Sequence, residues 1–180
     1  MTNSNATKQA MANALKELML LLPFEKISVS HICEKCNMNR KSFYYHFKDK
    51  YDLVNWIFDI ECISAITRQQ SADRWALMEV LIFYFYENKT FYRKIIKLKS
   101  QNSFSEHFRE FLYPIIRKRL DDIVEPSVKH DFMTDFLTDT CICAIERWLS
   151  EKECMPPEQL MHVIKSLTES VAISLCSEMN

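Results

Sequence analysis

Apolar residues recur along this chain at the three- and four-residue spacing of helices that bury one face, whereas the two-residue alternation of strands is almost absent. The first such series predicts a helix over about residues 5–22, which Pro23 ends. Its apolar members are Met11, Ala14, Leu15, Leu18, Met19 and Leu22. Because the same spacing continues to the end of the sequence, we expect an all-α fold.

Three more helices are expected before residue 61. Ser28 or Ser30 can cap the second helix, and a third short helix runs from about Arg40 to His46. Asp49 caps a longer fourth helix that continues through Ile60. The apolar face of the second helix consists of Val29, Ile32, Cys33 and Cys36.

Beyond residue 70 the spacing predicts five more helices, which makes about nine in total. We place them near residues 73–87, 89–98, 103–124, 130–150 and 157–177. Ser103 and Pro157 suit helix starts, and Pro114 should kink the helix that contains it. We expect two domains, a three-helix domain in residues 1–50 and a helical bundle in residues 51–180, joined through the fourth helix.

The composition removes several classes of protein. The chain has no glycine, which excludes a glycine-rich phosphate loop, a Rossmann fingerprint and a nucleophile elbow. Its seven cysteines are odd in number and scattered, as in reduced cytosolic proteins. We find no membrane-spanning run and no secretory signal, and we expect a cytoplasmic protein with no cofactor, no metal and no catalytic site.

The charge is unevenly distributed. Residues 1–50 contain eight basic and four acidic residues, a balance of +4, and the rest of the chain has a balance of −5. A basic head on an acidic body is typical of a protein whose head binds a polyanion, although a chance distribution of surface charge gives the same numbers.

The segment from residue 28 to residue 50 fits a helix-turn-helix, in which two short helices cross about a tight turn and the second enters a DNA major groove. The turn needs a left-handed residue, and Asn37 is the best substitute for glycine there. Phe43 and Phe47 are four residues apart and should face the core, which turns Arg40 and Lys41 outward. The donors of these two side chains can reach guanine, and the amide of Asn39 suits adenine.

Together with residues 23–29, this segment resembles the DNA-binding domain of TetR-family regulators. That family has Tyr-x-His-Phe at the end of the recognition helix and a lysine after the next loop, matched here by residues 44–47 and Lys50. The resemblance covers residues 8–58, and Asn37 departs from the family's turn glycine. It implies base contacts from Asn39, Arg40, Lys41 and Tyr45, and phosphate contacts from Tyr44, His46 and Lys50, to which the hydroxyls of Ser28, Ser30 and Ser42 can add.

Later segments resemble the C-terminal domain of one subgroup of that family, which includes regulators of dihydroxyacetone kinase operons. They are residues 88–94, 101–104, 145–149 and 155–158. The family places a small-molecule effector among helices of the body, where this chain is rich in aromatic residues. The candidate pocket is Phe83, Tyr86, Phe104, Phe108, Phe111 and Trp148, although ordinary core packing is the better explanation for any single one of them.

The last two helices carry apolar stripes that are wider than one buried face requires, which favours a homodimer over a monomer. The candidate interface is Phe136, Ile145, Trp148, Leu149, Ile164, Leu167 and Val171. We expect a homodimer that binds a pseudo-palindromic operator in double-stranded DNA and represses until an effector binds. A co-activator of the same fold that acts through a partner protein, and a small helical enzyme or carrier, remain alternatives.

Overall fold

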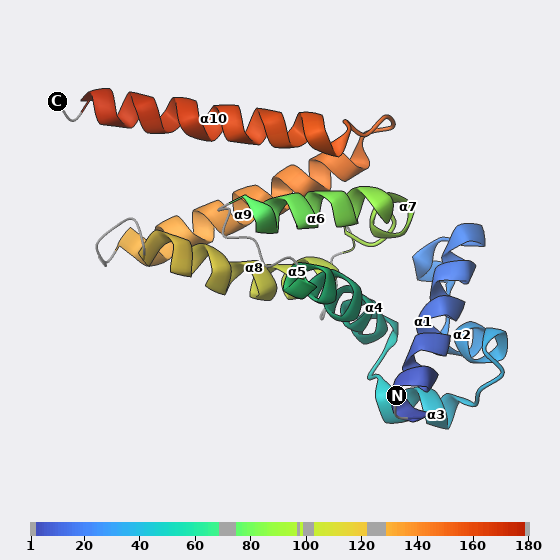
Figure 1. Ribbon diagram of the computed structural model, residues 1–180. Helices are drawn as coiled ribbons and strands as arrows, with labels where there is room; N and C mark the ends of the chain where they lie inside the picture. Colours follow the sequence, from blue (N-terminus) through green and yellow to red (C-terminus); the bar gives the residue numbers. More distant parts are fainter. Residues whose placement is uncertain (1–2, 69–74, 97, 99–102, 122–128, 179–180) are drawn as a thin grey trace.

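The computed structural model describes residues 3–68, 75–96, 98, 103–121 and 129–178, with the side chains of residues 4–66, 75–96, 98, 103–121 and 130–167. Every regular element in these ranges is a helix, and Figure 1 shows their arrangement. If the continuous helix over residues 50–68 is counted once, these ranges contain nine helices and one 3-10 turn. The predicted all-α fold is confirmed.

Three helices form the head: α1 (Asn3–Leu21), α2 (Val29–Lys35) and α3 (Arg40–His46). The apolar stripe predicted for the first helix faces inward, since Met11, Leu15 and Met19 are fully buried. After Pro23 the chain makes one 3-10 turn, η1 (Phe24–Lys26). Of the two serines that could cap α2, the structure uses Ser28.

A long helix leads from the head into the body. It consists of α4 (Lys50–Phe58), the π-helical segment η2 (Asp59–Ile63) and α5 (Ser64–Arg68). Asp49 caps it as predicted, because its Oδ1 accepts hydrogen bonds from the backbone N–H groups of Tyr51 at 2.8 Å and Asp52 at 2.9 Å. The domain boundary that we expected between residues 50 and 51 therefore lies at the first residue of α4.

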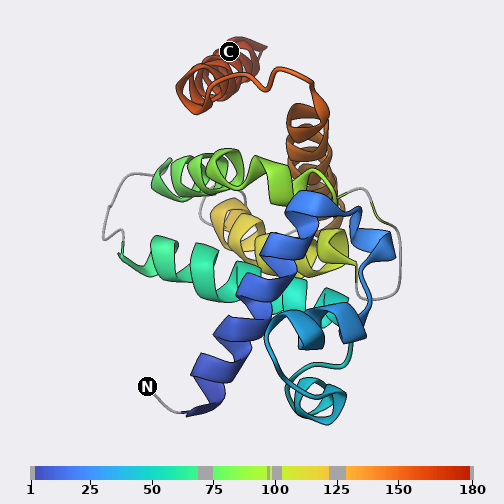
Figure 2. The same cartoon turned by 90° about the vertical axis from the view of Figure 1, so that its right-hand side faces the viewer.

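The body contains α6 (Ala76–Glu87), α7 (Lys89–Tyr92), α8 (Phe104–Asp121), α9 (Lys129–Ser150) and α10 (Pro157–Glu178). The helix predicted over residues 89–98 ends at Tyr92 and continues as turns, whereas α8 continues past Pro114 and α10 begins at Pro157 as expected. α8 and α9 pack along each other, with the guanidinium of Arg109 bonded to Asp135 at 2.6 Å and to Asp139. Figures 1 and 2 show the head and α10 at opposite ends of the molecule.

The head and the body share one hydrophobic core, which extends from Met11 in α1 to Met161 in α10. Its centre is aromatic: Phe58 of the long helix contacts the rings of Phe85, Phe104 and Phe108 at centroid distances of 5.3 to 6.1 Å. Rings at such distances stabilise each other beyond the area that they bury. Within the described ranges, no helix is both long enough and apolar enough to cross a membrane.

Candidate nucleic-acid interface

The turn between α2 and α3 has the left-handed residue that the sequence predicted. Asn37 has a φ of 54°, and the N–H of Met38 donates to the carbonyl of Cys33 at 2.8 Å, as in a Schellman motif. Asparagine tolerates this conformation better than other residues with a side chain. The turn therefore forms without glycine and directs the chain into α3.

Asn39 has a structural role at the start of α3. Its Oδ1 accepts a hydrogen bond from the backbone N–H of Ser42 at 2.8 Å and so caps the helix. A bidentate contact to adenine needs the same oxygen as an acceptor. The Nδ2 group makes no hydrogen bond in the cap and can donate to a base edge. A bidentate adenine contact would require the Oδ1 to share or break its bond to the N–H of Ser42.

The outer face of α3 carries the other predicted base contacts. Arg40, Lys41 and Tyr45 are exposed, with Tyr45 at 83%. The guanidinium of Arg40 lies over the ring of Tyr44 and donates to its hydroxyl at 3.4 Å. On the opposite face, Phe43 is buried in the core. Because the inner face is fixed, the outer side chains project in a defined direction.

Except for Lys50, the predicted phosphate contacts lie at the start of α2 and on α3. Ser28 is exposed, but its Oγ accepts from the N–H of His31 at 3.2 Å and its N–H donates to the Nδ1 of His31 at 3.3 Å. This capping box leaves the hydroxyl proton of Ser28 available to a phosphate. Tyr44 is half exposed, Ser30 and Ser42 are partly exposed, and the ring of His46 lies edge-on to Tyr45 at 4.9 Å.

Lys50 differs from the rest of this set. Its ammonium donates to the backbone carbonyls of Phe24 at 2.7 Å, Ile27 at 2.8 Å and Glu25 at 3.3 Å, and it lies 4.4 Å from the ring centroid of Phe24. Desolvation lowers the pKa of this ammonium below its usual value. All three donors are used within the chain, so a phosphate contact would require it to give up these bonds.

The candidate pocket residues do not surround one cavity. Phe104 and Phe108 are buried and stack on each other in the aromatic core, and Phe111 packs against the same cluster. Tyr86 stacks on Trp148 at 6.1 Å, and the indole N–H of Trp148 donates to the carbonyl of Met155. The aromatic richness therefore reflects ring-to-ring packing, and Phe104 and Phe108 belong to the core rather than to a pocket.

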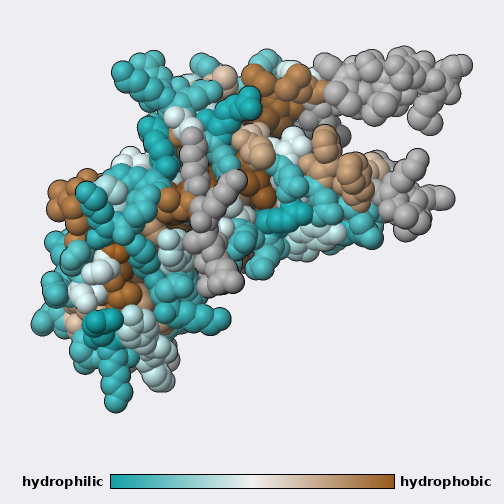
Figure 3. Space-filling view, turned by 180° about the vertical axis from the view of Figure 1, so that it is seen from behind, coloured by the Kyte–Doolittle hydropathy of each residue, from teal (hydrophilic) through white to brown (hydrophobic). Residues whose placement is uncertain are grey.

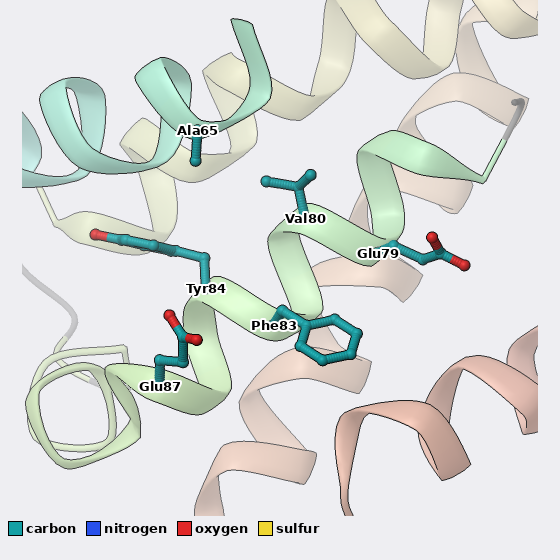
Figure 4. Close-up of a pocket in the computed structure, with 6 residues that line it drawn as sticks. All are labelled: Ala65, Glu79, Val80, Phe83, Tyr84 and Glu87. Carbon is teal, nitrogen blue, oxygen red and sulfur yellow. The ribbon is translucent and has the colours of Figure 1, made fainter. Parts of the chain in front are cut away.

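Phe83 is the candidate that faces an open hollow, and its side chain is 39% exposed. The hollow has a volume of about 400 Å³ and lies between α5 and α6, where it is lined by Ala65, Glu79, Val80, Phe83, Tyr84 and Glu87. Figure 4 shows Ala65 pointing from α5 toward α6, and the hydroxyl of Tyr84 directed away from Phe83.

The candidate interface residues also divide into two groups. Ile145, Trp148 and Leu149 are buried within their own chain, so they cannot present a surface to a partner. Phe136 and Leu167 are 60% and 61% exposed, and Ile164 is partly buried. Figure 3 shows apolar side chains gathered where α9 and α10 diverge. The side chain of Val171 lies outside the described residues.

Polar contacts between the head and the body were not predicted from the sequence. The ammonium of Lys16 in α1 donates to both carboxylate oxygens of Glu61, at 2.5 and 2.7 Å. The ammonium of Lys94 donates to the carbonyls of Met19 and Leu22 at the end of α1. The one available signal was an acidic residue at position 61, beside an otherwise apolar stripe.

The paired cysteines of α2 pack as the sequence suggested. Cys33 is buried, and the Sγ of Cys36 donates to the carbonyl of Cys33 at 3.6 Å. Burial raises the pKa of both thiols above their usual values, so both stay protonated near neutral pH. No group of three or more His, Cys, Asp or Glu residues in the described part of the chain is arranged to hold a metal ion.

Two family models match the chain. The model described as bacterial regulatory proteins, tetR family, matches residues 13–57, and the model described as transcriptional regulator C-terminal region matches residues 73–170. A curated relative, the HTH-type dhaKLM operon transcriptional activator DhaS of Lactococcus lactis subsp. lactis, is 28% identical over 145 residues. The matched region is 79% of this chain and 74% of that protein.

Two solved structures have the same fold. The dihydroxyacetone kinase operon activator DhaS is 22% identical with a TM-score of 0.66, and a TetR transcriptional regulator from Streptococcus agalactiae 2603V is 20% identical with a TM-score of 0.70. Each comparison covers 91% of this chain and 94% of the other. The fold therefore extends over nearly the whole molecule.

Proposed function

The chain belongs to the TetR family of bacterial regulatory proteins, and on that premise we propose that it binds a pseudo-palindromic operator as a homodimer. It is a DNA-binding transcription regulator rather than an enzyme. The observation that carries the proposal is the geometry of α3. Its inner face is fixed by buried Phe43, while Arg40, Lys41 and Tyr45 project from its outer face.

In this proposal two kinds of contact have separate roles. Arg40 and Lys41 contact guanine edges, with Tyr45 and the Nδ2 of Asn39 beside them in the major groove. Phosphate contacts come from Tyr44, His46 and the hydroxyls of Ser28, Ser30 and Ser42, and these set the register of the protein on the duplex. The positive balance of residues 1–50 supports the same orientation, with the head toward DNA.

The two-fold axis is proposed to pass beside α9 and α10. The exposed apolar side chains there, among them Phe136 and Leu167, exceed what a monomer usually leaves in water. A second copy that packs against them forms a four-helix bundle and turns the two heads toward the same side of a duplex. Their recognition helices then lie about 34–36 Å apart, which is one turn of DNA.

Regulation by a small effector in the body is part of the proposal, and the hollow beside Phe83 is the candidate site. Binding there would shift the dimer between forms whose heads match or miss successive major grooves. Repression relieved by the effector is the first mechanism. The second is activation, which the curated relative favours because it is a transcriptional activator. A reporter gene behind the bound DNA tests the sign: deletion of the regulator raises expression under repression and lowers it under activation.

The proposal is tested by selecting bound duplexes from a random-sequence library and measuring affinity for the selected duplex and for random DNA. We expect a palindromic sequence, and Arg40→Ala or Lys41→Ala should lower the preference for it by about 1–3 kcal/mol. Tyr44→Phe should weaken binding to both DNAs about equally. Lys152→Ala, an exposed lysine of the body, is the matched control. No enrichment in the selection, or equal losses for all variants, would contradict the proposal.

A further inference from the structure

The π-helical segment η2 lies where the head meets the body. Two of its residues, Asp59 and Glu61, are acidic and two positions apart, so their side chains leave the helix on nearly opposite sides. The Nε2 of His107 in α8 lies 2.7 Å from the Oδ1 of Asp59, and because a carboxylate can only accept, the imidazole donates this hydrogen bond. Glu61 faces α1 and α6 instead. π-Helical turns are uncommon and often occur at functional sites.

Glu61 joins three elements through one carboxylate. Both of its oxygens accept from the ammonium of Lys16 in α1, and Oε2 also accepts from the hydroxyl of Tyr84 in α6 at 3.3 Å. The hydroxyl of Tyr84 lies 2.6 Å from that of Tyr92. Desolvation raises the pKa of Tyr84, so its phenol stays protonated and can donate. The ion pair is largely buried, with 30% of the Lys16 side chain and 29% of the Glu61 side chain exposed.

α1 is the helix that these contacts hold. It packs on α2, α4 and α7, and Figure 2 shows it running from the end of the head that carries α3 up to the body. Lys94 holds its last turn through the carbonyls of Met19 and Leu22, and Lys16 holds it about one turn earlier. These two polar attachments, together with the packing of α1 on α7, define the direction of the helix. If the attachment through Lys16 is lost, α1 can tilt about the contacts that remain, and α3 tilts with it.

We propose that Glu61 is a positioning residue for operator recognition, which acts through Lys16 to set the angle between head and body and so the spacing of the two recognition helices. The inference rests on the homodimer proposed above, since spacing has a meaning only for two copies. Contacts within one half-site depend on the head alone. The match to two half-sites depends in addition on where the body holds each head.

The test compares full and half operators. Affinities are measured for the selected duplex, for a duplex with one half-site and for duplexes with one or two base pairs inserted at the centre. For Glu61→Gln and Lys16→Met we expect half-site affinity within about twofold of wild type and a loss of about threefold to thirtyfold on the full operator, the range usual for coupling through such networks. The penalty for inserted base pairs should shrink. The exchange of both charges, Lys16→Glu with Glu61→Lys, should restore much of the preference.

Glu17→Gln is the matched control. It breaks an ion pair of α1 with Lys35 at 2.9 Å that stays within the head, so it should leave the spacing preference unchanged. Thermal unfolding and sedimentation of each variant distinguish a misfolded protein from a folded one whose head is held at a different angle. If Glu61→Gln does not fold, Lys16→Met is used for the same comparison. An unchanged spacing penalty in the variants, or a parallel loss on half and full operators, overturns the inference. If the wild-type protein is a monomer or ignores spacing, the proposed function fails before any variant is compared.

Discussion

Replacing Lys50 by methionine removes an ammonium group that is bonded inside the chain while keeping most of the aliphatic side chain. The ammonium donates to three carbonyls of η1 and the residue that follows it, which are 23 to 26 positions earlier in the sequence. It thereby fixes the segment between α1 and α2 against the start of α4. We expect the Lys50→Met variant to reach the native fold but to have a lower free energy of unfolding than wild type.

The size of the effect follows from these contacts. Two of the three hydrogen bonds are short, at 2.7 and 2.8 Å, and a bond to a charged group contributes about 1.5–3 kcal/mol. The lowered pKa of Lys50 shows that desolvation of the ammonium offsets part of this gain. A net loss of about 1–3 kcal/mol in the free energy of unfolding remains, which corresponds to a fall of about 3–10 °C in Tm for a chain of this size.

Denaturant unfolding measures this loss directly, with Lys48→Met as the control because Lys48 is exposed and two residues away. The control should lie within about 0.5 kcal/mol of wild type. DNA binding gives a second measurement. If Lys50 keeps its internal bonds on the operator, the slope of log affinity against log salt should be unchanged. Unaltered stability together with a slope lowered by about one would refute this reasoning and support a phosphate contact instead.

Three more outcomes are expected. Asn37→Ala should destabilise the chain by about 1 kcal/mol in denaturant unfolding and Asn37→Gly should not, because only the alanine resists a positive φ; equal effects would contradict this. The hydrogen bond to Asp59 raises the pKa of His107, so its stabilising effect is complete below about pH 6.5 and disappears as the pH rises through the raised value. His107→Gln should therefore destabilise more at pH 6 than at pH 8, and the same loss at both would count against it. Phe136→Glu and Leu167→Glu should each convert a sedimenting dimer into a folded 21.4 kDa monomer, and a variant that remains dimeric would exclude that residue from the interface.

Local signals in the sequence predicted the helices and several of their ends. Ser28 and Asp49 cap helices, Pro157 begins one, and Asn37 takes the left-handed turn position, all through interactions within a few residues. Phe43 was placed correctly on the inner face of the recognition helix by its spacing from Phe47. Such features depend on neighbouring residues and can be predicted without knowing the fold.

Features that depend on distant contacts could not be predicted in this way. A wide apolar stripe does not say which side faces the chain's own core, and for that reason Ile145 and Leu149 were assigned to an interface that they do not reach. Lys50 bonds to backbone carbonyls, and because every residue has one, the residue types of its partners do not indicate the contact. The extra residue per turn in η2 is equally invisible in periodicity, and the role of Glu61 depends on it.

The bond from Lys94 to the end of α1 has a consequence for protein engineering. Hybrid regulators are made by joining the head of one protein to the body of another, and a junction at residue 50 is the natural choice here. That junction would separate α1 from Lys94 and Glu61, because both belong to the other half of the hybrid. A transplanted head would keep the helix cap at Ser28 and the turn at Asn37, but would lose the two polar contacts that set the direction of α1. A working chimera needs a receiving body with a lysine and a carboxylate at these two places.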